Sequence, residues 1–512
     1  MARAASFENS SVVFKDDGSS SSARSLSSDR GGFSEKNFNS DDHFDRRFLF
    51  MGMKANSKGK ESPQKQSSLD QKKGRTMNPL IQFKKIPILP LIAVALVIWV
   101  VPTAVQANEV THWNQIATDT LAAFPPAAGG APNALQINMG MTQGAVYDAV
   151  NAIGQTYQPY LLETRFNPSA SKEAATATAA YRVLSNIVST VPASISFPNR
   201  ATLQQTLDTE YTNSLTAIPD SPSKTAGIDA GNAAADAMIA ARQGDGRFGP
   251  SPWRMATGVG YWDPLQPNGT SPLDPTAWVA NVRPFLMQSS SQFRTDGPNA
   301  LTSTAYAEDF NEAKALGSVN STVRTSEQTH IAIFWQGAPP PLAWNFVARN
   351  LIAQYAVDMV DSALMFAMMN LSAADSAINC WNDKYYWDLW RPWTAIRQAD
   401  KDGNPDTEPD PSWAPLLTAP YPEHPSGHLS GDSAHLEVLQ MFFGTDKIRF
   451  GVTSSRFPGE TRYFDRFSDA LKEIIDARIW AGLHFRTADI QAKTLGRKVA
   501  DYMAKHYFQP VQ

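Results

Sequence analysis

The feature that most constrains this chain is the helical spacing of its apolar residues from about residue 108 onward. In "NALQINMGMTQGAVYDAVNAIG", Leu135, Met139, Val146, Val150 and Ile153 recur at intervals of three, four and seven residues, which places them on one face of a helix. Three further segments follow the same pattern and are rich in alanine, which favours helix: "KEAATATAAYRVLSNIV", "AGIDAGNAAADAMIAAR" and "FVARNLIAQYAVDMVDSALMFAMMNL". Alternating strand patterns are rare. We therefore predict an all-α, helical-bundle fold.

The helical pattern is interrupted between about residues 244 and 300, where Pro, Gly and Trp dominate. We predict a long irregular excursion there that packs over the helices. The chain has 512 residues, of which 42% are hydrophobic and 18% charged, so one large domain with appendages or two domains with a large core are expected. A formal net charge of -4 provides no basic surface, and we expect no nucleic-acid partner.

The N-terminal region differs in composition from the rest. Residues 1–76 are rich in Ser, Lys, Asp and Gly and are predicted to form a disordered polar tail. In residues 77–107, Lys84 and Lys85 precede an uncharged apolar run, 86–101, and small residues lead to Ala107, which is the layout of a secretory signal.

A second interpretation of residues 77–107 stays open. If translation begins at Met1, the run 86–101 could remain uncleaved as a single membrane anchor, although it is short for a span. The lysines before it would stay in the cytosol. Under either interpretation residues 108–512 lie outside the cytosol, as a secreted protein or as the outer part of a single-pass membrane protein, and only the 86–101 run touches a membrane.

The only cysteine, Cys380, excludes an intramolecular disulfide and a cysteine-rich metal site. It lies in the apolar stretch "ADSAINCW", and we interpret it as a buried structural thiol. Packing, hydrogen bonds and charge must therefore hold both the fold and any site.

Three short motifs near the C-terminus set basic residues inside apolar or aromatic sequence: Lys384 with Arg391 and Pro392, then the run Pro425, Ser426, Gly427 and His428, then Arg478 with His484. If Lys384 and Arg391 lie on one helix, they share a face two turns apart, and Pro392 ends or bends that helix. Ser426 and Gly427 suit a helix N-terminus, where unpaired backbone N–H groups attract anions.

Arg478 and His484 are predicted to lie on one apolar helix, facing partly different directions but able to converge on a large central group. Together the three motifs supply a lysine, two arginines, a serine hydroxyl, a glycine N–H and two imidazoles. All of these donate hydrogen bonds in at least one protonation state, and no carboxylate belongs to the set. A metal cation would need the opposite kind of ligand, so the pattern indicates a site for a tetrahedral oxyanion.

The order and spacing of these motifs resemble the signature shared by vanadium-dependent haloperoxidases and type 2 phosphatidic acid phosphatases. The segments "NALQINMGMTQGAVYDAVNAI", "GNAAADAMIAARQGDG" and "YAEDFNEAKALGSVNSTVRTSEQTHIAIFW" are similar to the soluble haloperoxidase-like branch, so the resemblance covers nearly all of 108–512. It implies that 108–512 form a catalytic domain with a haloperoxidase/acid-phosphatase-like helical bundle, long irregular loops and the anion at the centre.

The resemblance also implies a role for each motif residue. The equatorial oxygens of a vanadate cofactor would be held by Lys384, Arg391, Ser426, Gly427 and Arg478. His484 would bond the vanadium axially, which makes it the metal ligand, and His428 would be the acid–base for peroxide on the opposite side. Lys384, His428 and His484 are the residues implied in catalysis. Trp381 resembles the aromatic position near the family's halide site.

Two positions depart from the family pattern. Ala477 stands where the signature usually has Ser, and Asp489 lies five residues after His484 where the family's acid usually lies four after, which leaves its part in orienting His484 open. His424 is interpreted as a residue that could tune the pocket, and His435 as a structural residue. Tyr421 is interpreted as part of the pocket wall.

Two activities remain open for such a site. As a haloperoxidase, the protein would use vanadate, hydrogen peroxide and halide to halogenate a small organic acceptor. As an acid phosphatase, the same residues would bind phosphate, His484 would attack phosphorus to form a phosphohistidine, and His428 would protonate the leaving alcohol of a phosphate monoester. A third class, a binding protein with an inactive site, predicts a missing motif residue, and none of the seven is missing. The catalytic region lacks the membrane spans typical of the lipid phosphatases, so haloperoxidase ranks first.

Overall fold

The structure is a computed structural model that describes residues 108–251, 256–264, 269 and 273–511. The predicted polar tail, 1–76, and the predicted signal or anchor, 77–107, both lie outside these residues. No helix within the described ranges combines the length and apolar character that crossing a bilayer requires.

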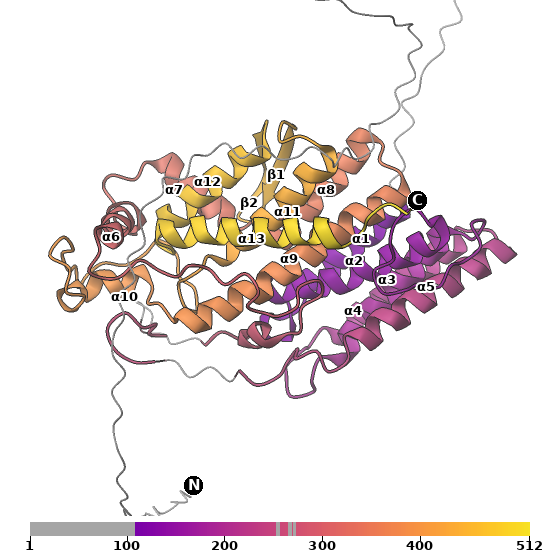
Figure 1. Cartoon of the computed structure of the whole chain (residues 1–512), viewed down its shortest axis with the longest axis horizontal. Coiled ribbons are helices and arrows are strands. Elements are labelled where there is room, and N and C mark those ends of the chain that lie inside the picture. The colour runs from indigo at the N-terminus through magenta and orange to yellow at the C-terminus, as the bar shows by residue number, and fades with distance from the viewer. Residues whose placement is uncertain (1–107, 252–255, 265–268, 270–272, 512) are drawn as a thin grey trace, which may run out of the picture. The chain divides into compact units, whose positions relative to one another are not determined.

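Two central helices, α2 (Pro132–Gly154) and α9 (Met359–Trp387), pack along one another (Figure 1). The predicted helix of 133–154 is confirmed, and its burial extends beyond the one apolar face that the spacing indicated. Residues 133–153 of α2 are buried on every side, including the polar side chains of Gln136, Asn138 and Thr142, because α3, α5, α8 and α9 surround this helix. Residues 362–385 of α9 are buried in the same way.

The remaining helices of the N-terminal half are α1 (Glu109–Ala122), η1 (Pro126–Ala128), α3 (Lys172–Thr190), α4 (Arg200–Thr216) and α5 (Pro222–Ala241). Side chains of Asn108, Ser171 and Ser221 cap α1, α3 and α5 by accepting hydrogen bonds from the backbone of the first turn. Helix α5 lies against α3, where Gly227 allows the backbone of Ser171 to approach closely.

The C-terminal half contains α6 (Thr304–Gly317), α7 (Ser326–Gln336), α8 (Pro340–Tyr355), α10 (Pro392–Arg397), η3 (Ala399–Lys401), α11 (Gly427–Phe443), α12 (Phe467–Trp480) and α13 (Arg486–His506). Strands in the described part of the chain form one antiparallel hairpin, β1 (Phe450–Ser454) with β2 (Phe457–Phe464), in which Phe450 pairs with Phe464. The prediction of an all-α, helical-bundle fold is confirmed.

The apolar segment from Phe346 to Leu371, which had the pattern of one helix, belongs to two. Helix α8 ends at Tyr355, and Ala356 takes a left-handed conformation with φ of 51°. The Asp358 side chain then accepts a hydrogen bond from the backbone N–H of Asp361 and starts α9. The spacing of apolar residues alone does not reveal this break.

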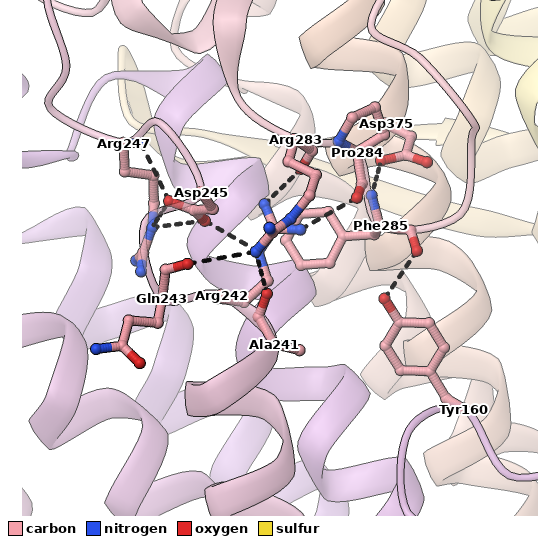
Figure 2. A network of polar contacts seen from close by, with 10 residues as sticks. All are labelled: Tyr160, Ala241, Arg242, Gln243, Asp245, Arg247, Arg283, Pro284, Phe285 and Asp375. Carbon is pink, nitrogen blue, oxygen red and sulfur yellow. Dashed lines mark hydrogen bonds and ion pairs between the residues drawn. The ribbon is translucent and has the colours of Figure 1, made fainter.

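The predicted irregular excursion is confirmed for its described residues, in which the only helix between α5 and α6 is the short η2 (Ala277–Asn281), packed on α9. A buried network holds the excursion in place (Figure 2). Arg242 donates to Asp245 Oδ2 at 2.9 Å and to the carbonyl of Arg283 at 2.6 Å. The carboxylate of Asp375, on α9, accepts backbone N–H bonds from residues 285–287 at 2.6 to 2.8 Å. The excursion is therefore attached to α9 through buried charges.

Helices α11 and α13 approach closely at Gly496. A Cβ atom there would lie 2.1 Å from Ser433 Oγ and 2.3 Å from the carbonyl oxygen of Ser430. The two helices therefore have no space between them for a side chain at this position. This contact matters for function because α11 begins at the predicted Ser-Gly-His turn.

We expect Gly496→Ala to lower the free energy of unfolding by about 1–3 kcal/mol, because the added methyl group forces α11 and α13 apart. This loss should appear although alanine is the better helix former. The measurement is urea denaturation followed by circular dichroism. Lys498→Ala, at an exposed position of the same helix, is the control and should stay within about 0.5 kcal/mol of the original protein. Equal stability of the two variants would contradict the packing argument.

Candidate active site

Lys384 lies in the last turn of α9 and is fully buried. Its Nζ donates hydrogen bonds to the backbone carbonyls of Pro422 (3.1 Å), Glu423 (3.1 Å) and Pro425 (2.5 Å). Burial lowers its pKa to about 8, and the nearby Arg391 acts in the same direction. A lysine in these surroundings is a cation held by carbonyl dipoles.

Arg391 does not continue the helix of Lys384, so the prediction of a shared helical face was wrong. Helix α9 ends at Trp387 because Asp388 adopts a left-handed conformation with φ of 48°, and Arg391 caps the next helix, α10, whose first residue is Pro392.

The structure nevertheless brings the two cations together. Arg391 is fully buried and donates to the carbonyls of Tyr421 (2.9 Å), Pro422 (3.2 Å) and Leu483 (2.8 Å). The carbonyl of Pro422 thus accepts from both Arg391 and Lys384. Burial lowers the pKa of Arg391 to about 10, which leaves it charged at neutral pH.

Helix α11 begins at Gly427 with Ser426 as its N-cap, as predicted from the sequence. A Cβ atom on Gly427 would lie 2.9 Å from two carbon atoms of the Trp381 indole, so glycine is required for this close approach. Trp381 is fixed from its other side, where its Nε1–H donates to Asp274 Oδ2 at 2.8 Å. The turn and the indole therefore form one rigid wall.

Arg478 and His484 do not lie on one helix, contrary to the prediction. Helix α12 ends at Trp480, Gly482 takes a left-handed conformation with φ of 70°, and His484 belongs to the connection before α13. Both side chains are still buried in the same region, because His484 Nε2 lies 3.4 Å from Arg391 Nη1 and Arg478 affects the pKa of both His428 and His484.

Both imidazoles are neutral at physiological pH. Burial holds the pKa of His428 well below its ordinary value, and the nearby cation of Arg478 lowers it further. Burial does the same for His484, assisted first by Arg391 and then by Lys384. Each ring therefore has an unprotonated nitrogen available for bonding or for taking a proton.

Several buried polar atoms at this site have no hydrogen-bond partner among the described residues: Ser426 Oγ, His428 Nε2 and Arg478 Nε. An unpaired buried polar group costs about 1–3 kcal/mol, so such atoms close together indicate a place for a polar ligand. The set offers the Ser426 hydroxyl and an Arg478 N–H as donors and a ring nitrogen of His428, beside the buried cations Lys384 and Arg391, which suits a tetrahedral oxyanion such as vanadate or phosphate. The residues present therefore fit the implied cofactor. Because each N–H of Lys384 already has a carbonyl partner, a direct bond from Lys384 to the oxyanion requires the release of one carbonyl.

Two carboxyl groups border the site, and the sequence pattern did not single out the more important one. Glu423 is fully buried, and its Oε1 accepts hydrogen bonds from His484 Nδ1 at 2.8 Å and from the backbone N–H of Phe485 at 3.0 Å. Burial raises the pKa of Glu423 to about 8, against the lowering effect of Arg391. The one signal in the sequence is that Glu423 directly precedes the run from His424 to His428.

Asp489 is the carboxylate whose part in orienting His484 was left open, and the His484 ring pairs with Glu423 instead. Burial raises its pKa well above the ordinary value, and Ser426 and Arg478 oppose this rise, so Asp489 lies beside those two residues. Its geometry with Ser426 falls short of a hydrogen bond, and neither carboxylate oxygen has a partner in the part of the chain that the structure describes.

The other residues singled out in the sequence are buried or partly buried and have defined neighbours. The Tyr421 ring lies under two cations, with Lys384 Nζ at 5.1 Å and the Arg391 guanidinium at 5.2 Å from its centroid. His424 Nε2 lies 3.3 Å from Thr295 Oγ1 on the outer side of the site. His435 pairs through Nδ1 with the carbonyl of Gly431 at 2.8 Å, one turn back along α11. Cys380 is a buried free thiol, as expected.

Comparison with known proteins finds relatives of this chain. Residues 364–512 match the family described as the VCPO second helical-bundle domain. The chain is 26% identical over 221 residues to a vanadium chloroperoxidase of Curvularia inaequalis, a match that covers 35% of this chain and 35% of that protein. The alignment thus spans about a third of the length of this curated relative.

Solved structures extend the similarity over most of the chain. A bacterial vanadium-dependent iodoperoxidase superposes with a TM-score of 0.63 at 22% identity, covering 78% of this chain and 97% of the other. A holo-type bacterial vanadium-dependent chloroperoxidase gives a TM-score of 0.57 at 18% identity, with the same coverage. At these identities the superpositions establish the fold. The matched helical-bundle domain and the curated relative support the same relationship to the vanadium haloperoxidase superfamily.

Proposed function

We propose that this protein is a vanadate-dependent haloperoxidase, which oxidises a halide with hydrogen peroxide and halogenates a small organic acceptor. The observation that carries the proposal is the group of unpaired buried polar atoms at Ser426, His428 and Arg478 beside two further buried cations. The names of the similar proteins, a chloroperoxidase and an iodoperoxidase, support the same reaction class.

The chain's own residues would bind the cofactor by charge and by hydrogen bonds. Arg391 and Arg478 have N–H groups to spare after their protein contacts, and the N-terminus of α11 adds the Gly427 N–H and the Ser426 hydroxyl. His484 would be the protein ligand to the metal through its neutral imidazole. When bound, vanadate supplies a Lewis-acid centre that makes a peroxide oxygen electrophilic without a change in the metal's oxidation state.

His428 would move the proton of the incoming peroxide. It lies in the first turn of α11, its Nε2 is buried, and burial, assisted by the cation of Arg478, lowers the pKa of the ring and favours its neutral form. Trp381, held against Gly427 by Asp274, would form the wall at which halide approaches.

An acid phosphatase is the second candidate, because the same donors would accept phosphate. The unprotonated imidazole of His484 would attack phosphorus and form a phosphohistidine, and His428 would protonate the leaving alcohol. Both reactions use one oxyanion pocket, so direct assays must separate them.

We infer that the catalytic domain, residues 108–512, acts outside the cytosol. The inference rests on the basic residues, apolar run and small residues within 77–107. It leaves open whether the run 86–101 is removed or retained as an anchor.

We expect the full chain, supplied with vanadate, to brominate or iodinate a phenolic acceptor in the presence of hydrogen peroxide. His484→Ala should abolish the reaction with unchanged helix content, and His428→Ala should lower the rate by about 100-fold or more while vanadate still binds. The assays are halogenation by absorbance and vanadate binding by calorimetry. Turnover that is the same without vanadium, or hydrolysis of phosphate monoesters without halogenation, would contradict the haloperoxidase assignment.

We expect Gly427→Ala to weaken vanadate and phosphate binding together by at least about tenfold, because the new Cβ must displace the Trp381 indole and widen the turn. Calorimetric titration with each anion measures the change, and phosphate should compete with vanadate in the original protein. Unchanged affinity in the variant would show that the turn does not contact the anion.

We expect the intact mass of the exported protein to correspond to a chain that begins at Asn108 if the signal is cleaved. If the apolar run remains as an anchor, the mass should correspond to a chain that still includes residues 77–107. Mass spectrometry of secreted and membrane fractions distinguishes the two results. Recovery of the protein only from the cytosol would contradict export.

A further inference from the structure

The ring of His484 is held between a cation and a carboxylate. Its Nε2 lies 3.4 Å from Arg391 Nη1, and its Nδ1 lies 2.8 Å from Glu423 Oε1. An arginine can only donate hydrogen bonds, so Nε2 must carry the lone pair. The proton therefore sits on Nδ1 and is donated to Glu423. Both contacts specify the same tautomer.

The segment between α12 and α13 that contains His484 is not helical, so hydrogen bonds from other parts of the chain must hold it in place. It follows Gly482, whose backbone is left-handed, and precedes the start of α13 at Arg486. The same oxygen of Glu423 that accepts from the His484 ring also accepts from the backbone N–H of Phe485 at 3.0 Å. One carboxylate oxygen therefore fixes both the ring and the chain beside it.

Glu423 is itself held firmly. Its backbone N–H donates to the carbonyl of Leu389 at 3.0 Å, and its own carbonyl accepts from Lys384 Nζ at 3.1 Å. Its side chain is completely buried. The position of His484 is thus connected to the cation cluster through a residue with little freedom to move.

We propose that Glu423 is a positioning residue that holds His484 as the Nδ1–H tautomer with the Nε2 lone pair facing the oxyanion. The inference deepens the proposed function and rests on it for the use of His484 as the ligand. It assigns to Glu423, which precedes the Ser-Gly-His turn, the orienting role that Asp489 does not fulfil. A carboxyl oxygen that accepts the hydrogen bond from Nδ1–H makes the opposite nitrogen more basic, and loss of such a partner typically weakens a metal site by about 10–100-fold.

The first measurement is nitrogen NMR of the full chain labelled at histidine and free of vanadate, with His484→Gln used to assign the signal. The original protein should show a protonated Nδ1 and an unprotonated Nε2 at His484. Glu423→Ala should lose this single tautomer, because the ring then has no acceptor at Nδ1. A mixed or inverted tautomer in the original protein would overturn the proposal.

The second measurement is vanadate affinity by calorimetry. Glu423→Ala should bind vanadate about 10–100-fold more weakly. Glu423→Gln has the same shape and keeps an acceptor oxygen, so it should retain the tautomer and recover part of the affinity. This isosteric variant decides the matter if the alanine variant does not fold, since a vanadate affinity equal to that of the original protein would overturn the proposal.

Asp489→Asn is the matched control, because it alters another buried carboxyl group of the same site. It should leave the His484 tautomer unchanged, whereas a shift of that tautomer would assign the orienting role to Asp489 and overturn the proposal. Failure of the proposed function can be distinguished from failure of this proposal. A protein that binds vanadate but does not halogenate would still show the changes in tautomer and vanadate affinity in the Glu423 variants.

Discussion

The C-terminal half of the molecule is built around three buried cations, Lys384, Arg391 and Arg478. Like charges in a low-dielectric core repel one another and lose their hydration, so they persist only where polar groups surround them. Backbone carbonyls of residues 421–423, 425 and 483 surround Lys384 and Arg391, and the side-chain oxygen of Gln336 accepts from Arg478. These carbonyls are free because prolines at 420, 422 and 425 prevent residues 420–425 from forming a helix, which would have used the carbonyls internally. The proline-rich segment is therefore as necessary to the site as the cations themselves.

The fold class, and which of the singled-out residues lie close together, could be predicted from the sequence better than the local backbone structure of those residues. Helical spacing identified 133–154 and 172–188 as helical, but it did not show that 133–153 is enclosed on all sides, because burial depends on neighbours in space. The rotation argument failed for Arg391 and His484, since Asp388 and Gly482 end the preceding helices with left-handed residues. The shared ability of these side chains to donate hydrogen bonds does not depend on helix geometry, and it predicted more reliably which of them lie close together. Glu423 could not be identified from the sequence because it is a single acidic residue between prolines and belongs to no helical or motif spacing.

Helix α9 forms hydrogen bonds with both the irregular excursion and the proline-rich segment 420–425. Asp375 and Asp383 accept backbone N–H bonds from the irregular excursion, as does Asp388, the residue that ends the helix. Lys384, one residue after Asp383, points instead to the proline-rich segment. Adjacent residues on a helix face different directions, which lets a single helix hold the excursion on one side and the site on another. The excursion therefore needs little secondary structure of its own.

The bond from Trp381 to Asp274 gives the excursion an influence over the reaction region that its irregular backbone does not suggest. Asp274 also accepts from the Tyr385 hydroxyl at 2.8 Å and is anchored by the Thr276 backbone N–H at 2.8 Å. The indole that borders Gly427 is thus held by a loop, whereas the cation-binding carbonyls come from a separate stretch of chain. Replacement of the loop sequence around Asp274 would therefore move the indole while leaving intact the carbonyls that hold Lys384, so the two parts can change independently.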